Sequence, residues 1–283
     1  MCATCGCGGD DAVVTLAGHN DHDHPHDHDH PHDHTHPHDR THPHDRTQPE
    51  PQPRTQTITL EQKVLAKNDL AAEENRKWLA ERSIVALNMT SSPGAGKTTL
   101  LERTIRDLGG QRPIAVIEGD QETLLDANRI RAAGARAVQI NTGAGCHLDA
   151  DMVRRALETL DPEPGSLLFI ENVGNLVCPA MFDLGEHSKV VVISVTEGTD
   201  KPLKYPYMFA AAGLVVINKT DLLPYVDFDV DACAEYAQSL NPGVKILPLS
   251  ATQGGGVADW YSWIDTMANR RQPESSPDVV DLP

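Results

Sequence analysis

Ser91-Ser92-Pro93-Gly94-Ala95-Gly96-Lys97-Thr98-Thr99 is the stretch that decides the fold. It follows the P-loop pattern G-x-x-x-x-G-K-[ST], except that Ser91 replaces the first Gly. Apolar residues 84–89 before it predict a buried strand, and residues 98–108 predict a helix. In this setting the backbone N–H groups bind phosphate, Lys97 reaches the β- and γ-phosphate oxygens, and Thr98 ligates Mg²⁺. The predicted phosphate-binding residues are Gly94, Ala95, Gly96, Lys97, Thr98 and Thr99.

Strands and helices alternate along the rest of the chain. Strands are predicted at 113–117, 137–140, 167–170, 190–195, 214–217 and 244–247, and helices at 60–82, 124–133, 150–160, 230–240 and 256–269. Thr59 is expected to cap the helix at 60–82. Apolar strands that alternate with helices predict an α/β fold, a mostly parallel sheet with helices on both faces. Ligands of such sheets bind at the carboxyl ends of the strands.

A second motif identifies the base of the nucleotide. Asn218-Lys219-Thr220-Asp221 follows a predicted strand and resembles the N-K-x-D motif of GTPases. The Asp221 carboxylate can accept hydrogen bonds from N1–H and N2–H₂ of guanine, donors that adenine does not present together. The Lys219 stem can lie over the base, and Asn218 can brace the loop. Ser250-Ala251 resembles the weaker fifth GTPase motif, whose backbone contacts the guanine oxygen. Together the motifs predict GTP and GDP as ligands.

Two carboxylates are candidates for catalysis and for binding Mg²⁺. Glu171 begins Glu171-Asn172-Val173-Gly174, which looks like a Walker B or third GTPase motif, with Gly174 placed to sense the γ-phosphate. Asp120 ends the neighbouring predicted strand. Either can ligate Mg²⁺ directly or through water, and Asp120 can instead cap a helix. Asn175 stands where a water-positioning Gln would follow Gly174, which predicts slow, switch-like GTP hydrolysis.

Cys146-His147 and Cys178 form a candidate metal site within the folded part of the chain. Both segments follow predicted strands, at the same end of the sheet. Thiolate and imidazole suit Ni²⁺ or Zn²⁺. Taken singly, Cys178 would be read as a buried structural thiol, but the shared location favours a metal. Adjacent Cys and His do not easily complete a tetrahedral site, so we expect a second subunit to contribute. Cys233 and His187 are interpreted as structural.

The N-terminal segment carries two further groups of candidate metal ligands. Cys2, Cys5 and Cys7 form a C-x-x-C-x-C cluster far from any predicted core, and the α-amine freed by removal of Met1 could complete an S₃N set for Ni²⁺. Twelve of the fourteen histidines fall between residues 19 and 44, mostly at alternate positions. A purification tag or a solvated tail is the alternative, but Asp and Pro interrupt the tract. We predict nickel storage by His22, His24, His26, His28, His30, His32, His34, His36, His38, His42 and His44.

Composition and charge predict where the folded domain lies and which classes of partner are excluded. Residues 8–56 hold almost no large apolar side chains and cannot offset the entropy of ordering. We expect a disordered metal-binding tail at 1–56, a P-loop GTPase domain at 57–271 and a disordered tail at 272–283. The net charge of −17, without basic clusters, argues against nucleic acid. No apolar run is long enough for a membrane span, and there is no secretory signal. The cysteine pattern favours a reducing cytoplasm.

These motifs together resemble the HypB family, GTPases that help to insert nickel into [NiFe]-hydrogenase precursors. The resemblance covers nearly the whole chain: C-x-x-C-G-C at Cys2–Cys7, the His-rich tract, Ser91–Thr99, Glu118–Gln121, Gly143–His147, Glu171–Pro179 and Asn218–Asp221. It implies the SIMIBI class of P-loop GTPases, GTP-dependent homodimers, and a metal site of Cys146, His147 and Cys178 near the dimer interface. The implied partners are a HypA-type nickel chaperone and the hydrogenase large-subunit precursor.

Three other functions fit part of the sequence. A urease nickel chaperone of the UreG type has Cys-Pro-His at its metal site, whereas this chain has Cys178-Pro179-Ala180. A metal-storage protein with a residual GTPase would not need complete phosphate and guanine motifs. A GTPase that loads cobalamin or a mutase would not need the His-rich tract. The sequence therefore favours a HypB-type function.

Overall fold

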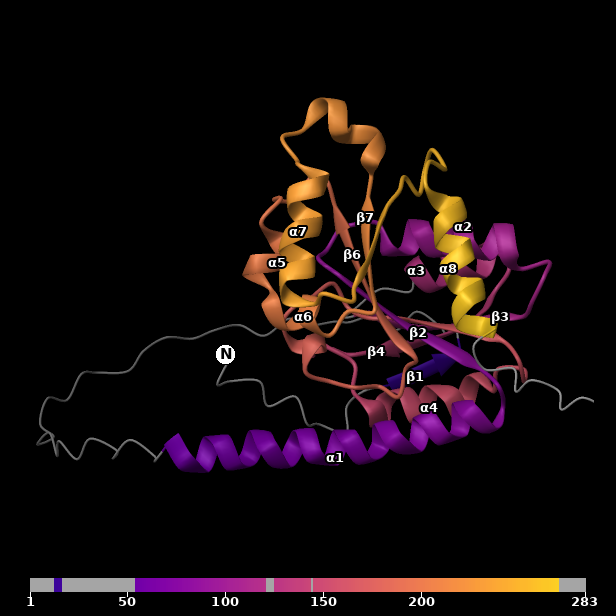
Figure 1. The fold of residues 1–283 in the computed structure, drawn as a ribbon. Helices are drawn as coiled ribbons and strands as arrows, with labels where there is room; N and C mark the ends of the chain where they lie inside the picture. Colours follow the sequence, from indigo (N-terminus) through magenta and orange to yellow (C-terminus); the bar gives the residue numbers. More distant parts are fainter. Residues whose placement is uncertain (1–12, 17–53, 121–124, 144, 270–283) are drawn as a thin grey trace, which may run out of the picture.

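The computed structural model describes residues 13–16, 54–120, 125–143 and 145–269, as an α/β domain with one long helix along its side (Figure 1). Its strands are β1 (Val13–Leu16), β2 (Val85–Ser91), β3 (Ile114–Asp120), β4 (Arg136–Asn141), β5 (Leu167–Glu171), β6 (Ser188–Ser194), β7 (Leu214–Asn218) and β8 (Lys245–Pro248). Its α-helices are α1 (Arg54–Glu81), α2 (Lys97–Leu108), α3 (Leu125–Ala132), α4 (Ala150–Leu160), α5 (Lys201–Lys204), α6 (Pro206–Ala210), α7 (Val230–Leu240) and α8 (Val257–Asn269), with 3₁₀ turns η1 (Cys178–Ala180) and η2 (Thr220–Tyr225).

The eight strands form one sheet in the order β1-β4-β3-β5-β2-β6-β7-β8. The strands β2 to β8 are parallel, and β1 pairs antiparallel with β4 at the edge. The chain moves from β2 to one side of the sheet and later returns to the other side, so β2 lies between β5 and β6. Such a reversal opens a crevice at the carboxyl ends of the strands. The P-loop begins there, at the end of β2.

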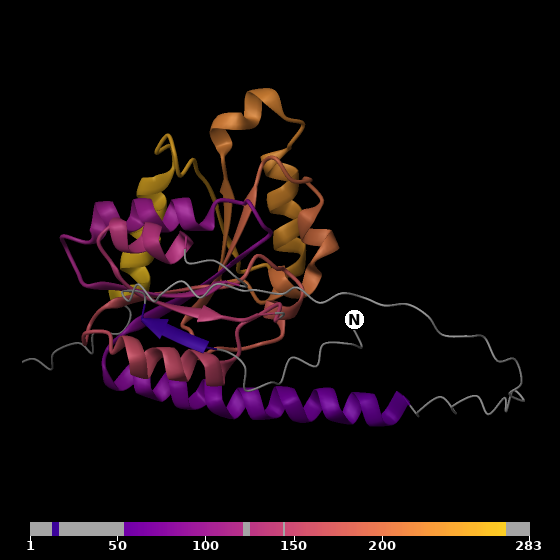
Figure 2. The ribbon, with the colours of Figure 1, turned by 180° about the vertical axis from the view of Figure 1, so that it is seen from behind.

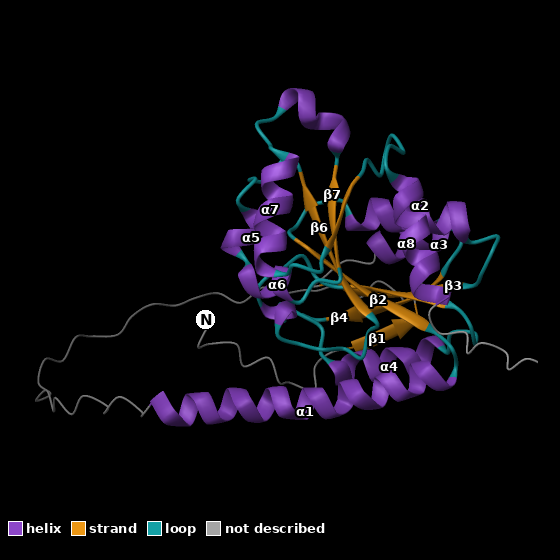
Figure 3. Cartoon of the chain, in the orientation of Figure 1, coloured by secondary structure: helices purple, strands orange, loops and turns teal. Residues whose placement is uncertain are grey.

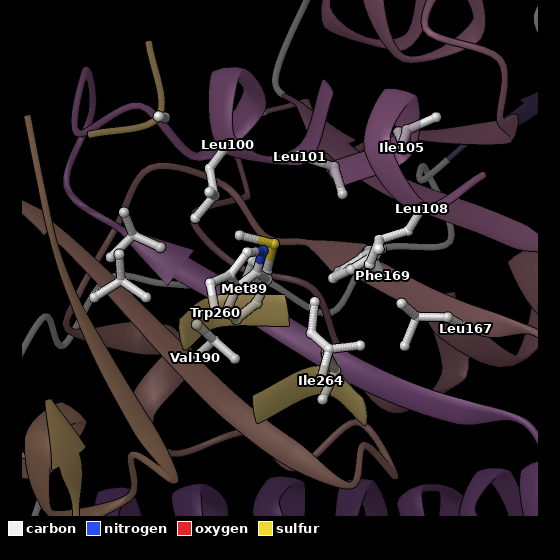
Figure 4. Close-up of a cluster of buried hydrophobic side chains, with 14 of the residues drawn as sticks. Met89, Leu100, Leu101, Ile105, Leu108, Leu167, Phe169, Val190, Trp260 and Ile264 are labelled. Carbon is white, nitrogen blue, oxygen red and sulfur yellow. The ribbon is translucent and has the colours of Figure 1, made fainter. Parts of the chain in front are cut away.

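Helices cover both faces of this sheet, as Figure 3 shows. The helices α2, α3 and α8 pack on one face over a core that includes Phe169 and Trp260, whose ring centroids lie 6.4 Å apart (Figure 4). On the opposite face, α1 and α4 cover β3, β4 and β5, while α6 and α7 cover β6 and β7. The apolar runs that predicted buried strands are thus covered on both sides, which confirms the expected fold class.

The structure differs from the sequence-based expectation at the N-terminal side. Helix α1 begins at Arg54, so Thr59 lies inside it and is not its cap. The helix therefore begins three residues before the predicted domain boundary at residue 57. The segment expected to be disordered also contains β1, whose backbone pairs with the open edge of β4, from Val13 opposite Asn141 to Leu16 opposite Val138. An open edge strand accepts such a partner readily.

The remaining expectations for the two tails concern residues that lie outside the described ones. Within the described ranges, no helix is long and apolar enough to span a bilayer. The short helices α5 and α6 were not predicted, because each is too brief for a helical period and has Pro in its first turn.

Candidate functional site

The phosphate loop joins β2 to α2. Gly96 has φ of 96°, and a Cβ there would lie 2.5 Å from Nδ2 of Asn218, so this position requires glycine. The Lys97 Nζ donates a hydrogen bond to Ser91 Oγ at 2.8 Å. Ser91, which departs from the P-loop pattern, thus continues the strand and holds the ammonium group within the loop. Burial lowers the pKa of Lys97, and the carboxylate of Glu171 opposes that shift.

Four acidic and hydroxyl side chains face this loop. Glu118 on β3 and Glu171 on β5 are register partners on adjacent strands. The Thr98 Oγ1 donates to Glu171 Oε1 at 2.7 Å and lies 3.4 Å from Asp126 Oδ2 on α3. Burial raises the pKa of Glu171, and burial with the Glu171 charge raises the pKa of Glu118 to about 9.

This donor set fits a magnesium ion. Among the described residues, Oε2 of Glu118 and Oε2 of Glu171 are buried and have no hydrogen-bond partner. Buried carboxylate oxygens of this kind are stabilised by a hard divalent cation, which takes oxygen ligands. The Thr98 hydroxyl and the carboxylates of Asp120 and Glu171 line the same cavity and are the residues that would hold Mg²⁺.

The phosphate loop and the acidic residues enclose a cavity of about 640 Å³. Its walls include Ser91, Gly94, Ala95, Gly96, Lys97, Thr98, Thr99, Glu118, Asp120, Asp126, Arg129, Cys146, Glu171, Gly174 and Lys219. Sequence reasoning gave no role to Glu118, Asp126 or Arg129. Glu118 lies two residues before Asp120, so both side chains point to the same face of β3. Asp126 and Arg129 are three residues apart on α3, and their side chains form an ion pair at 2.9 Å.

The base-recognition loop is tied directly to the phosphate loop. Asn218 Nδ2 donates to the Ala95 carbonyl at 2.9 Å, which confirms the predicted bracing role of Asn218. Lys219 Nζ donates to the Gly94 carbonyl at 2.7 Å. The Ala251 N–H donates to Asn218 Oδ1 at 3.1 Å, and its contact with guanine stays a prediction. The two motifs, more than a hundred residues apart in sequence, therefore form one nucleotide site.

Asp221 is oriented by a neighbouring hydroxyl. The Ser250 Oγ donates to Asp221 Oδ1 at 2.5 Å, and it also accepts from the Gln253 N–H at 3.0 Å. The Ser250 hydroxyl is held by the Gln253 N–H and in turn fixes the Asp221 carboxylate. The carboxylate keeps lone pairs that can accept hydrogen bonds from guanine. Ser250 thus acts through its side chain.

The predicted metal ligands Cys146, His147 and Cys178 come together. The two Sγ atoms lie 2.9 Å apart, and Cys146 Sγ lies 3.6 Å from His147 Nδ1. The candidate ligand atoms of all three residues fall within 4.8 Å of one another. The His147 ring contacts that of Phe182, with centroids 3.9 Å apart and the ring planes tilted by 33°. Burial lowers the pKa of His147, which favours the neutral imidazole that binds metals. Three ligands leave a tetrahedral site one ligand short.

Two asparagines connect the nucleotide site to this metal site. Asn172 Oδ1 accepts from the Leu148 N–H at 3.3 Å, and Asn175 Nδ2 donates to the Cys146 carbonyl at 3.0 Å. Between them, a Cβ on Gly174 would lie 3.1 Å from Pro93 of the phosphate loop. Residues 172–175 therefore touch the phosphate loop on one side and hold the peptides around His147 on the other.

The other cysteine and histidine of the folded domain have structural positions, as predicted. Cys233 on α7 is 1% exposed, and burial raises the pKa of its thiol to about 12. His187 Nδ1 accepts from the Ala86 N–H at 3.0 Å and so helps to join the loop before β6 to β2. The N-terminal cysteines and the His-rich tract lie outside the described residues, so their metal-binding role stays a prediction.

Known proteins share both the sequence and the fold. The family described as CobW/HypB/UreG, nucleotide-binding domain, matches residues 85–248. The hydrogenase maturation factor HypB of Azotobacter chroococcum is 58% identical over 218 residues, which cover 77% of this chain and 72% of that protein. The crystal structure of HypB from Archaeoglobus fulgidus is similar with a TM-score of 0.67 and 42% identity, and the match covers 72% of this chain and 100% of that chain.

A second structure carries a metal. The crystal structure of HypB from Helicobacter pylori in complex with nickel matches with a TM-score of 0.68 and 37% identity, covering 75% of this chain and 99% of that one. The family match at residues 85–248 spans the P-loop, the base-recognition loop and both loops of the cysteine site. The chain belongs to the HypB family of hydrogenase maturation factors.

Proposed function

We propose that the protein is a GTP-hydrolysing nickel metallochaperone that stores Ni²⁺ and delivers it during maturation of the [NiFe]-hydrogenase large subunit. The observation that carries the proposal is that Cys146 belongs both to the cysteine–histidine cluster and to the wall of the nucleotide cavity. A nucleotide switch and a site for a soft divalent metal thus share one domain. The names of the curated relatives and the nickel in the H. pylori structure support this reading.

The nucleotide site supports slow GTP hydrolysis. Asp221 selects guanine, and Lys97 neutralises charge on the β- and γ-phosphates as the terminal bond breaks. Thr98, Asp120 and Glu171 would hold magnesium, which would supply positive charge to offset that of the phosphates. Asn175, which follows Gly174, donates its amide to the Cys146 carbonyl. Its side chain is thus committed to the metal loop, which fits a switch with slow turnover.

A GTP-dependent homodimer would complete the metal site. Cys146, His147 and Cys178 supply three ligand atoms, one fewer than a tetrahedral site needs. Val177 and Met181, which flank the 3₁₀ turn that carries Cys178, are 55% and 49% exposed. An apolar rim around an incomplete metal site suits contact with a second copy. A HypA-type chaperone and the large-subunit precursor are the further partners that we propose.

Complementation of a deletion strain tests this function. The wild-type chain should restore hydrogenase activity at low nickel, whereas Cys178→Ala should restore it only with excess nickel. Urease activity, measured in the same cells, distinguishes a hydrogenase role from a urease role. Full complementation by Cys178→Ala at low nickel would remove the metal site from the delivery pathway.

Asp221→Asn should change the preferred nucleotide from GTP to XTP. The asparagine amide donates where guanine also donates, while xanthine presents a carbonyl oxygen at that position. We expect GTP affinity to fall about 10- to 100-fold, the scale of a buried unpaired polar group. Nucleotide competition binding measures the change. Ser250→Ala is the matched control, because it should weaken GTP binding without favouring XTP. Unchanged GTP affinity in Asp221→Asn would contradict the assignment.

Deletion of residues 19–44 should separate storage from hydrolysis. The shortened chain should lose most of the Ni²⁺ that the full chain binds, because the tract supplies the great majority of its imidazoles. Its GTPase rate should stay the same, because all residues of the nucleotide site remain. Equilibrium dialysis with Ni²⁺ and a phosphate-release assay measure the two quantities. Equal nickel stoichiometry before and after deletion would mean that the tract is not the reservoir.

A further inference from the structure

Helix α1 packs against the ends of both loops that carry the metal ligands. It lies beside α4 on the outer side of the domain, as both views show (Figures 1 and 2). Its inner side carries two buried amides, Asn68 and Asn75, which are 6% and 0% exposed. Seven residues separate them, close to two helical turns, so they face the same way. Buried side-chain amides normally have hydrogen-bond partners, so the partners of Asn68 and Asn75 show what these residues hold in place.

Both asparagines bridge the same two segments of chain. Asn68 Oδ1 accepts from the Ala150 N–H at 2.9 Å, while its Nδ2 donates to the Asp183 carbonyl at 2.8 Å. Asn75 Nδ2 donates to the Ala150 carbonyl at 2.9 Å and to the Leu184 carbonyl at 3.1 Å. The start of α4 is thereby joined through α1 to the loop that precedes β6.

These are the two segments that meet again at the metal site. Ala150 follows His147 by three residues, and Asp183 follows Cys178 by five. The Cys146 and Cys178 sulfur atoms are 2.9 Å apart, and the rings of His147 and Phe182, one from each segment, are also in contact, with centroids 3.9 Å apart. The segments are therefore fixed at both ends: by the ligands at one end and by the asparagines at the other.

The loop of Cys178 also rests directly on the backbone of α1. Gly185 has φ of +87°, and a Cβ there would lie 2.6 Å from the Ala72 carbonyl oxygen and 2.7 Å from the Asn75 Cβ. Arg76 Nη2 pairs with Asp183 Oδ2 at 2.6 Å, beside the Asn68 hydrogen bond. The loop thus packs closely on the helix, so loss of the hydrogen bonds from Asn68 and Asn75 should shift the position of the loop.

We propose that Asn68 and Asn75 are positioning residues that set the separation of the two ligand loops and so tune nickel binding at Cys146, His147 and Cys178. The inference rests on the proposed metal function. Neither asparagine touches the ligands, so both act as partners that orient them. Loss of a partner that bonds a ligand directly typically weakens metal binding about 10- to 100-fold. Asn68 and Asn75 bond backbone groups beyond the ligands, so for Asn68→Ala and Asn75→Ala we expect a loss near the lower end of that range, about 10-fold.

The test uses the full chain with Cys2, Cys5 and Cys7 replaced by Ser. In this parent, sulfur-to-nickel charge-transfer absorption reports Cys146 and Cys178, because histidines give no such band and Cys233 is buried. Nickel titrations followed at this band should show weaker binding and a shifted spectrum in Asn68→Ala and Asn75→Ala, with GTP affinity kept. If Asn75→Ala does not fold, Asn68→Ala carries the test.

Asn241→Ala is the matched control. Asn241 Nδ2 also donates to two backbone carbonyls, those of Ala210 and Ala212, but it joins α7 to α6 and contacts neither ligand loop. Nickel affinity and spectrum should stay at parent values in this variant. Parent-like nickel binding in Asn68→Ala and Asn75→Ala, or an equal loss in Asn241→Ala, would overturn the positioning role. Absence of the thiolate band in the parent would overturn the proposed metal site itself.

Discussion

Lys97→Ala should lower the rate of GTP hydrolysis by at least about 100- to 1,000-fold, the loss seen when one preorganised group that stabilises the transition state is removed. The Lys97 Nζ lies inside the phosphate loop, held by Ser91 Oγ at 2.8 Å, and is 9% exposed as a residue. The ammonium group is thus already in position before the reaction, so it does not have to move to stabilise the transition state. A phosphate-release assay at saturating GTP measures the effect on kcat.

Lys219→Ala provides a matched control in the same cavity. Lys219 also binds a carbonyl of the phosphate loop, that of Gly94, but it belongs to the base-recognition motif. Its loss should raise KM while leaving kcat close to the wild-type value, because base contacts are the same in the ground and transition states. A wild-type kcat in Lys97→Ala would mean that the P-loop lysine does not stabilise the transition state.

The regular elements were predictable because their signals are local. The buried strands appear as apolar runs such as residues 190–195, and the helices α4 and α7 match their predicted bounds. Each of these helices is capped by the Asp that precedes it, Asp149 and Asp229. Elements without a local signal were missed. The strand β1 forms only because β4 offers it an open edge, and the extension of α1 to Arg54 has no cap residue that marks it.

The site was predictable where motifs carry it and not where contacts between distant segments carry it. The P-loop and the base-recognition motif could be named from their sequence patterns, and the three metal ligands from their residue types and their positions after predicted strands. The roles of Asn68, Asn75, Asn172 and Asn175 could not, because each amide bonds a backbone group 24 or more residues away. An asparagine within a helix or loop gives no indication in sequence of the peptide that it will bind. Glu118 could have been identified from its alternation with Asp120 on one strand.

Cys178→Ala should weaken nickel binding in the folded domain and remove the dependence of nickel release on the bound nucleotide. Residues 172–175 lie against Pro93 of the phosphate loop and also hold the Leu148 and Cys146 peptides. A shift of this segment when the γ-phosphate leaves therefore moves the ligand loop. Coupled sites typically change each other's affinity about 5- to 150-fold, and the change is reciprocal. Nickel transfer to a chelator is followed at the sulfur-to-nickel charge-transfer band, which reports the cysteine site and not the His-rich tract. It is measured with GDP and with a non-hydrolysable GTP analogue, in the chain with Ser at positions 2, 5 and 7.

A more specific test keeps the metal ligands and removes the hydrogen bond between Asn175 and the Cys146 carbonyl. Asn175→Asp retains the acceptor oxygen that binds the Val177 N–H at 2.9 Å but replaces the donor to the Cys146 carbonyl. It should still bind nickel at both cysteines, yet the affinities in the two nucleotide states should become nearly equal. Asn141→Asp is the matched control, because it adds the same charge at the exposed end of β4, before the loop of Cys146, and keeps the oxygen that accepts from the Gly143 N–H at 2.8 Å. A uniform effect of that charge cancels in the ratio of the two affinities. If Asn175→Asp keeps the wild-type ratio, the hydrogen bond to Cys146 does not transmit the state of the nucleotide to the metal.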